Sequence, residues 1–164
     1  MLKIFKLLLL SLALISSVYA HAEDGLPNIS RLDKNFSGKH VDYFANGKPK
    51  YEVHYKNGKK EGLETFWYNS GAKYIQTNYK DDKEEGTWNQ WYESGQLKLD
   101  AQYQDGKEHG HFQQWFESGQ KRSEAFFKAG KKYGTETYWN KDGTIKSQST
   151  YKDGDIVKDV SATN

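Results

Sequence analysis

Apolar and polar side chains alternate along one type of segment in this chain, most clearly in the sequence LKLDAQYQ. One side of this segment, if extended, would carry Leu99, Ala101 and Tyr103, while the other side would carry lysine, aspartate and glutamine. Alternation with a period of two predicts a β-strand with one buried face. The same pattern occurs 24 residues earlier, around Ile75, and 24 residues later, around Ala125.

The strand signal belongs to a 24-residue unit that is repeated without insertion or deletion. The four full copies are YKNGKKEGLETFWYNSG, YKDDKEEGTWNQWYESG, YQDGKEHGHFQQWFESG and FKAGKKYGTETYWNKDG, which begin at Tyr55, Tyr79, Tyr103 and Phe127. Partial copies lie before the first and after the last of them. A strict period of this length indicates an array of identical supersecondary units.

Each unit is expected to form one β-hairpin. Asn57-Gly58 and Asp105-Gly106 are signals for two-residue hairpin turns, because both central positions of such a turn need a positive φ. Extended segments are expected at residues 86–93 and 97–104, with a Ser-Gly turn between them. Frequent Gly, Asn, Ser and Asp leave no window for a packed helix. We therefore predict an all-β fold, a single-layer antiparallel β-meander of about five 24-residue hairpin repeats with roughly ten strands.

Two residue types recur at fixed positions of the first strand of each unit. They are Trp67, Trp91, Trp115 and Trp139, and Gly62, Gly86, Gly110 and Gly134. Adjacent Trp91 and Tyr92 must point to opposite faces, and we favour the tryptophans as the buried column. A one-residue change in the closure of the Ser-Gly turn would bury the tyrosines instead. A glycine within a strand weakens it unless something approaches its backbone, so we expect an aromatic ring over these glycines.

The first residues of the chain resemble an export signal. A short basic start is followed by an apolar run and then by Val18, Tyr19 and Ala20, which is the pattern of a secretory signal peptide cleaved after Ala20. We therefore expect a signal peptide at 1–20, a lead-in that caps the sheet edge at 21–40, the repeat domain at 41–155 and a tail at 156–164. The protein is expected to be exported, and to be periplasmic or secreted.

Charge and cysteine content narrow the classes of partner. Removal of the signal peptide takes away Lys3 and Lys6, which leaves 22 basic against 22 acidic residues. A neutral mature chain has no global field to hold nucleic acid. The chain has no cysteine, so the sequence offers no disulfide framework and no thiolate nucleophile.

The sequence gives only weak evidence for catalytic or metal-binding residues. His109 and His111 would lie on one side of a strand, but a metal site needs three or four converging ligands. The carboxylates each have a basic neighbour two residues away, as in Asp100 with Lys98, Glu124 with Arg122 and Glu52 with Lys50, which is typical of a solvated sheet face. We predict no catalytic residues, no metal and no cofactor, so the protein is not expected to be an enzyme.

Two columns of side chains are candidates for binding. A mostly basic column contains Lys50, Tyr74, Lys98, Arg122 and Lys146, spaced by two strands or roughly 10 Å. An aromatic column contains Tyr68, Tyr92 and Phe116, which a single-layer sheet could expose as a contact surface or pack together as a structural ladder. The turn at Asp81-Asp82 lacks the glycine of the other copies, and it would be either a tolerated variation or an acidic contact for a partner.

The unit GxxxxWYxSGQxKxxxxYxDGKxxG resembles the MORN repeat, and specifically the bacterial variant of the YwqK-type antitoxin family. The resemblance extends over about residues 38–154. It implies an antiparallel sheet of hairpins that acts as a binding scaffold without catalysis, with a toxin protein as the partner of YwqK-type members. A predicted signal peptide remains compatible with protection against a toxin that is active in the periplasm.

The sequence supports three classes of function in a definite order. We expect an exported repeat scaffold that binds another protein through one face of its sheet. The alternative is an envelope or secreted factor whose aromatic and basic face binds a glycan or an anionic lipid. An enzyme comes last, because identical repeats give no unit a chemistry of its own.

Overall fold

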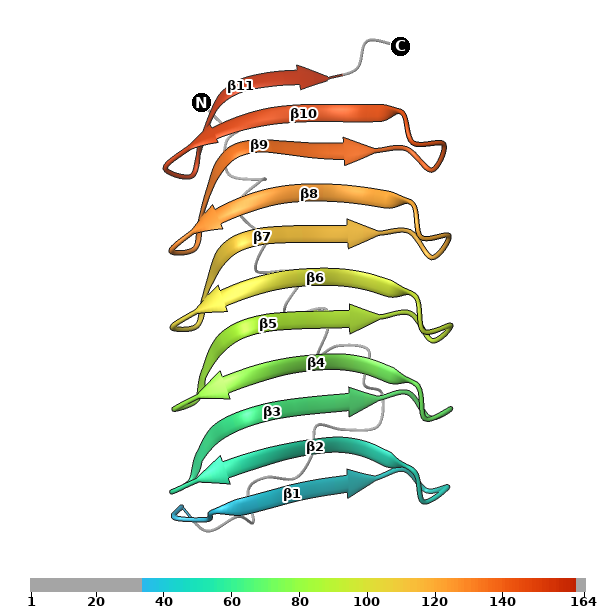
Figure 1. The fold of residues 1–164 in the computed structure, drawn as a ribbon, viewed down its shortest axis with the longest axis vertical. Coiled ribbons are helices and arrows are strands. Elements are labelled where there is room, and N and C mark those ends of the chain that lie inside the picture. Colours follow the sequence, from blue (N-terminus) through green and yellow to red (C-terminus); the bar gives the residue numbers. More distant parts are fainter. Residues whose placement is uncertain (1–33, 162–164) are drawn as a thin grey trace, which may run out of the picture. The chain divides into compact units, whose positions relative to one another are not determined.

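The repeats form one antiparallel sheet, in which every strand pairs with its neighbours in the sequence (Figure 1). The computed structural model describes residues 34–161, so the predicted signal peptide lies outside the described residues. The eleven strands are β1 (Gly38–Tyr43), β2 (Pro49–Lys56), β3 (Lys59–Trp67), β4 (Lys73–Lys80), β5 (Lys83–Trp91), β6 (Leu97–Gln104), β7 (Lys107–Trp115), β8 (Lys121–Lys128), β9 (Lys131–Trp139), β10 (Ile145–Lys152) and β11 (Asp155–Ser161). The predicted all-β meander is confirmed, with one strand more than expected.

The ends of the sheet extend into segments expected to lie outside the repeats. β1 begins in the stretch that the sequence suggested as a lead-in, and its residues pair along β2. β11 occupies most of the expected C-terminal tail and pairs with β10. No helix long and apolar enough to cross a membrane occurs among the described residues.

The two-residue turns have the backbone conformation that the sequence predicted. Asp105 and Gly106 have φ values of 51° and 75°, as both central residues of a type I′ turn require. Asp82 keeps this conformation with φ 67° although it replaces a glycine. Its side-chain oxygen Oδ1 accepts a hydrogen bond of 2.7 Å from the backbone N–H of Lys60 in the preceding turn. Aspartate is therefore held in the turn by a contact that glycine could not make.

The glycine inside the first strand of each unit marks a β-bulge. Thr77 pairs with Trp88 and Tyr79 pairs with Glu84, so the segment around Gly86 contains extra residues on β5. Gly86 has φ 84°, a conformation that costs an ordinary L-residue about 1–2 kcal/mol. Outside the chain neighbours, no atom lies within 4 Å of a β-carbon built at Gly62, Gly86 or Gly134, so lack of space does not explain these glycines. An aromatic residue is paired opposite each of them, as Tyr79 is opposite Gly62. The positive φ explains the choice of glycine, and a ring packed over its backbone stays a prediction.

Most of the buried side chains lie on one face of the sheet, which we call the core face, whereas the buried Thr65 and Thr137 lie on the other face. On the second strand of each unit the core face carries the predicted positions, and the buried ones are Ile75, Thr77, Tyr79, Leu99, Ala101, Ser123, Ala125 and Phe127. The alternation in the sequence therefore identified the correct face. The opposite face carries Asp100 and Gln102 and is called the polar face.

Two buried carboxylates lie on the core face, one toward each end of the array. Glu64 is 2% exposed, and its Oε1 accepts hydrogen bonds from the Tyr51 hydroxyl (2.7 Å) and from Lys60 Nζ (2.5 Å). Three units later, Glu136 accepts hydrogen bonds from Lys132, Tyr138 and Tyr151. Burial and the Glu64 carboxylate raise the pKa of Tyr51, which keeps its hydroxyl a donor.

The inner units exchange the order of polar and aromatic residues at these positions. The outer units have Glu64 followed by Phe66, and Glu136 followed by Tyr138. The inner units have Trp88 followed by Gln90, and Phe112 followed by Gln114. Each unit thus places one ring and one polar group on the core face, and only the order differs.

The tryptophan column is not the buried column. Trp67, Trp91, Trp115 and Trp139 are all half-buried, and none belongs to the buried core. Strand β5 places Gln90 on the core face, with 5% exposure, so the adjacent Trp91 points away from the core. The prediction was wrong because the position before the tryptophan, which is polar in the inner units, fills the core row.

Replacement of Trp91 by alanine should therefore destabilise the protein moderately. Loss of a fully buried tryptophan costs about 3–5 kcal/mol, and a half-buried ring should cost about 2 kcal/mol. Lys73 Nζ, 5.7 Å from the Trp91 ring centroid, would also lose its aromatic contact. Urea unfolding of the variant measures this, and a loss equal to that of Ile75→Ala would show that the ring is fully packed.

Candidate binding face

A second bulge, near the other end of each hairpin, gives the basic column its position. In the β5–β6 pair, Gln90 faces Leu99 and Trp91 faces Leu97, so Lys98 is the extra, unpaired residue. The same register shift occurs in every unit. The extra residues are Lys50, Tyr74, Lys98, Arg122 and Lys146. The column found in the sequence is therefore a column of bulge residues.

The bulge residues and the aromatic column come together beside the hairpin turns, on the same side of the sheet as the core face and opposite to the tryptophans. Lys98 Nζ lies 5.3 Å from the centroid of the Tyr92 ring, and Arg122 Cζ lies 5.9 Å from that of Phe116. Four such pairs follow one another along the sheet, and we call them the aromatic–cation ladder. They are Phe44–Lys50, Tyr68–Tyr74, Tyr92–Lys98 and Phe116–Arg122. Three of the four pairs are cation–π contacts, in which the face of the ring attracts the cation. The Tyr68–Tyr74 pair is a contact between two rings.

Lys146 does not join the ladder. Asn140 occupies the position that Tyr92 and Phe116 have in the earlier units, so no ring is present under Lys146. Its side chain is exposed. The structure thus brings together five of the six residues that the sequence proposed for binding, and it leaves Lys146 apart.

Two tyrosine hydroxyls attach the ladder to the neighbouring units. The Tyr68 hydroxyl donates a hydrogen bond of 2.8 Å to the backbone carbonyl of Trp91, and Tyr92 donates one of 2.9 Å to that of Trp115. Burial, followed by the nearby Tyr74, raises the pKa of Tyr68 to about 12. The hydroxyl therefore stays protonated and remains a donor at physiological pH. The rings are half-buried, so they are both structural contacts and part of the surface.

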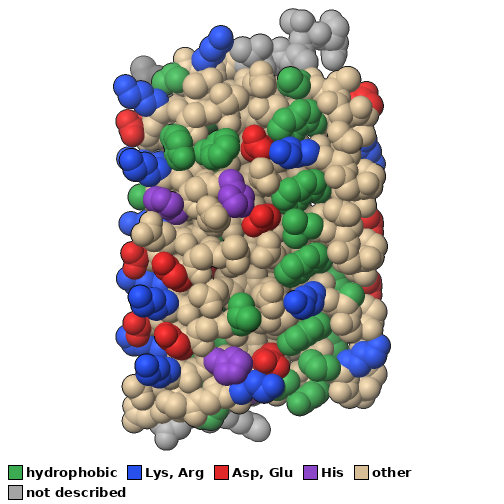
Figure 2. Space-filling view, in the orientation of Figure 1, with side chains coloured by type: hydrophobic (Ala, Val, Ile, Leu, Met, Phe, Trp, Pro, Cys, Tyr) green, Lys and Arg blue, Asp and Glu red, His purple; other side chains and the backbone are tan. Residues whose placement is uncertain are grey.

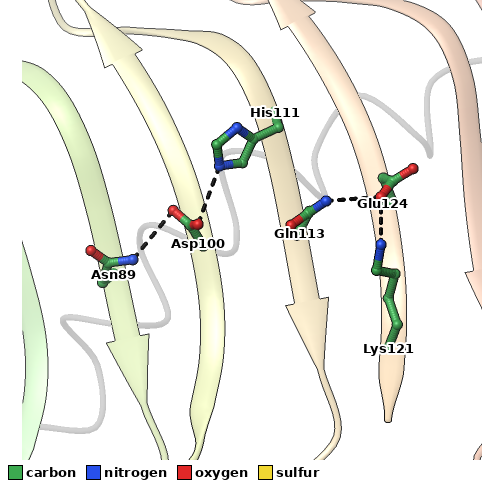
Figure 3. A network of polar contacts seen from close by, with 6 residues as sticks. All are labelled: Asn89, Asp100, His111, Gln113, Lys121 and Glu124. Atoms are coloured by element: carbon green, nitrogen blue, oxygen red, sulfur yellow. Dashed lines mark hydrogen bonds and ion pairs between the residues drawn. The ribbon is translucent and has the colours of Figure 1, made fainter. Parts of the chain in front are cut away.

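A row of polar side chains runs across the strands of the polar face, on the side of the sheet opposite to the ladder (Figure 3). Asp100 accepts a hydrogen bond of 3.2 Å from Asn89 Nδ2, and its other oxygen lies 3.2 Å from His111 Nε2. One strand pair further, Glu124 Oε2 accepts hydrogen bonds from Gln113 Nε2 (2.8 Å) and Lys121 Nζ (2.7 Å). The Lys121 contact is the main reason that the pKa of Glu124 is lowered.

The basic residues two positions before Asp100, Glu124 and Glu52 do not form ion pairs with them. These acids pair instead with His111, Lys121 and Lys39. The basic residues themselves, Lys50, Lys98 and Arg122, lie over aromatic rings. The bulge causes this change, because the extra residue is placed over the ring of the preceding turn.

The result is a difference in charge pairing between the two faces. Among the described residues, no carboxylate lies within ion-pair distance of Lys98 or Arg122. The carboxylates of Asp100 and Glu124 on the polar face, by contrast, each have two partners. Figure 2 shows the polar face, with hydrophobic side chains in a column along its right side and histidines and acids nearer the middle.

His109, His111 and the Asp81-Asp82 turn lie apart from the ladder. His109 is exposed, whereas the half-buried His111 contacts Asp100. Residues 34–161 contain no group of three or more His, Asp or Glu arranged to hold a metal ion. Asp81 lies 3.4 Å from Lys59 of the preceding turn, at the opposite edge of the sheet from the ladder.

Sequence reasoning missed the pairing of the two columns, although a signal for it exists. Each ring precedes its bulge residue by six positions, as in Tyr92 and Lys98. The polar row also has a constant spacing of 11, as in Asn89 with Asp100 and Gln113 with Glu124. Both spacings become informative only after the register of the hairpins is known.

Comparison with known proteins agrees with this architecture. The model of the MORN repeat variant family matches residues 37–57, 60–81, 84–105, 108–129 and 132–153. No curated protein matches the chain. The five matches cover more than half of the sequence and coincide with the hairpins, so the chain belongs to the MORN repeat variant family.

Proposed function

We propose that this MORN repeat scaffold is exported and binds another protein through the face of its sheet that carries the aromatic–cation ladder, with the ladder as the contact surface. The observation that supports the proposal is the pair of cations, Lys98 and Arg122, each held over a ring without a carboxylate partner among the described residues. Aromatic residues and arginine are enriched in the energetically dominant parts of protein interfaces. A partner carboxylate would supply the missing counter-charge.

The charge pattern favours a protein over a polyanion. The ladder contains only three cations, Lys50, Lys98 and Arg122, and its Tyr68–Tyr74 pair carries none. A polyanion would need a longer run of cations to be held by charge. A protein surface can combine acidic groups for the cations with apolar groups for the rings.

Membership of the YwqK-type antitoxin class would make the partner a toxin protein. We propose this only for a toxin that acts where an exported chain could meet it, in the periplasm or outside the cell. The predicted signal peptide of residues 1–20 supports that location. In this role the scaffold blocks its partner by occupying it and needs no catalytic residue, metal or cofactor of its own.

The proposal is tested by affinity capture from the cell envelope of the source organism. The bait is the tagged mature chain, beginning at His21, and the test variant combines Lys98→Glu with Arg122→Glu. The matched control combines Lys107→Glu with Lys128→Glu, which changes the net charge equally at exposed lysines away from the ladder. Melting temperatures of all three baits check that they fold.

We expect the wild-type bait and the control to retain one dominant protein. The test variant should retain less of this protein, by a factor of about ten or more. Equal capture by the test variant would contradict the use of the ladder. Retention of lipid or glycan instead of protein would support the alternative, an envelope-surface factor, and would contradict protein binding.

A further inference from the structure

The spacing of the ladder restricts the conformation of a segment that could follow it. Successive pairs, such as Tyr92–Lys98 and Phe116–Arg122, are two strands apart in one continuous sheet. Neighbouring strands are about 4.8 Å apart, so the pairs repeat at about 9.6 Å. The ladder crosses the strands along the length of the sheet.

One regular backbone conformation matches this repeat closely. A polyproline II helix has three residues per turn and a rise of about 3.1 Å, so every third residue returns to the same side after about 9.3 Å. An α-helix returns after seven residues and about 10.5 Å. A β-strand returns to one side every second residue, after about 6.6–6.8 Å, and its third residue points the opposite way.

The chemistry of the ladder agrees with the same conformation. Proline-rich polyproline II segments bind to surfaces lined with aromatic rings, and the ladder offers Phe44, Tyr68, Tyr92 and Phe116 in sequence. The tyrosine hydroxyls hold two of these rings in place. At Lys98 and Arg122 a cation is added to the ring, and a carboxylate is its natural partner.

We infer that the ladder binds a polyproline II segment of the partner protein that has two carboxylates three residues apart, one at Lys98 and one at Arg122. The Tyr68–Tyr74 pair, which has no cation, receives an uncharged position of the same segment. This inference rests on the proposed function and names the chemistry of its partner.

The test uses two synthetic peptides of equal composition and measures fluorescence anisotropy at low salt. In one peptide Glu-Pro-Pro is repeated five times, and in the other the prolines form one block and the glutamates another. Mature wild-type protein should bind the repeated peptide about tenfold more tightly than the block peptide, because its carboxylates alone match the spacing of the cations. The Lys98→Glu, Arg122→Glu variant should lose this preference, and the Lys107→Glu, Lys128→Glu control should keep it.

Equal affinity for the two peptides would overturn the inference, since charge alone would then explain binding. Preference for vesicles of anionic phospholipid over both peptides would also overturn it. Protein capture that depends on Lys98 and Arg122, combined with equal peptide affinities, would leave the proposed function intact and reject only the conformation of the segment. Preference for the repeated peptide without any captured protein would support the spacing and contradict the proposed function.

Discussion

Replacement of Glu64 by alanine is expected to lower the free energy of unfolding by about 3–5 kcal/mol, the range for breaking a buried ion pair by removal of one partner. The Glu64 side chain is 2% exposed, and its Oε1 accepts hydrogen bonds from the Tyr51 hydroxyl and Lys60 Nζ. Alanine would leave the buried hydroxyl without an acceptor and the ammonium without its counter-charge. Chemical denaturation of the variant and the wild type measures the difference.

A surface carboxylate of the same sheet provides the control. Glu52 pairs with Lys39 at 3.1 Å, with side chains that are 30% and 52% exposed, so Glu52→Ala should cost about 0–1 kcal/mol. Glu64→Gln should fall between the two, because an amide oxygen still accepts from Tyr51 but does not balance the charge of Lys60. A cost for Glu64→Ala no larger than that of Glu52→Ala would contradict a structural role for the buried carboxylate.

Replacement of Gly58 by alanine is expected to cost about 3 kcal/mol or more, as the sum of backbone strain and a lost hydrogen bond. Gly58 has φ 77°, and a β-carbon built there lies 1.8 Å from the backbone oxygen of Lys34. The turn would have to move, which would break the hydrogen bond of 2.8 Å from the Gly58 N–H to the Phe36 carbonyl. Thermal unfolding followed by circular dichroism measures the loss.

Gly62 separates the two contributions in the same hairpin. Its φ is 86°, but no atom lies within 4 Å of a β-carbon built there. Gly62→Ala should therefore cost only the strain, about 1–2 kcal/mol. If the two variants were equally stable, the contact between the Asn57-Gly58 turn and the residues before β1 would contribute nothing to the fold.

Both predictions concern the N-terminal end of the array, where a repeat protein differs from its inner units. Atypical terminal units protect the ends of such arrays. Here the outer units contain the buried carboxylates Glu64 and Glu136, whereas the inner units place Trp88 and Phe112 at the same positions. The Asn57-Gly58 turn is further covered by the preceding segment, since the Asn57 N–H donates to Ser37 Oγ.

The binding proposals concern the inner units and can be tested separately from stability. Lys98 and Arg122 belong to bulges, and their side chains are not buried, unlike those of Leu99 and Ser123. Charge reversal at these positions should therefore change binding with little change in unfolding. This separation makes the charge variants better probes of the face than truncation of Tyr92, whose hydroxyl also contacts the next unit.

Much of the fold was determined by local sequence. The 24-residue period, the Asn-Gly and Asp-Gly turns and the alternation around Leu99 each depend on residues close together in the chain. A turn that needs two positive φ values and a strand with one apolar side specify hairpins wherever they occur. For this reason the meander, its turn conformations and the buried side of each second strand could be predicted.

Tertiary structure alone decided which side chains meet across the strands. One bulge residue per hairpin separates Lys98 and Arg122 from the acids beside them in sequence and places them over Tyr92 and Phe116. The acids then find partners on neighbouring strands, as Asp100 does with His111. A register shift of one residue changes the face and the neighbours of a side chain. Pairing between strands sets that shift, so the tryptophan column and the ladder could not be predicted from the order of residues within one strand.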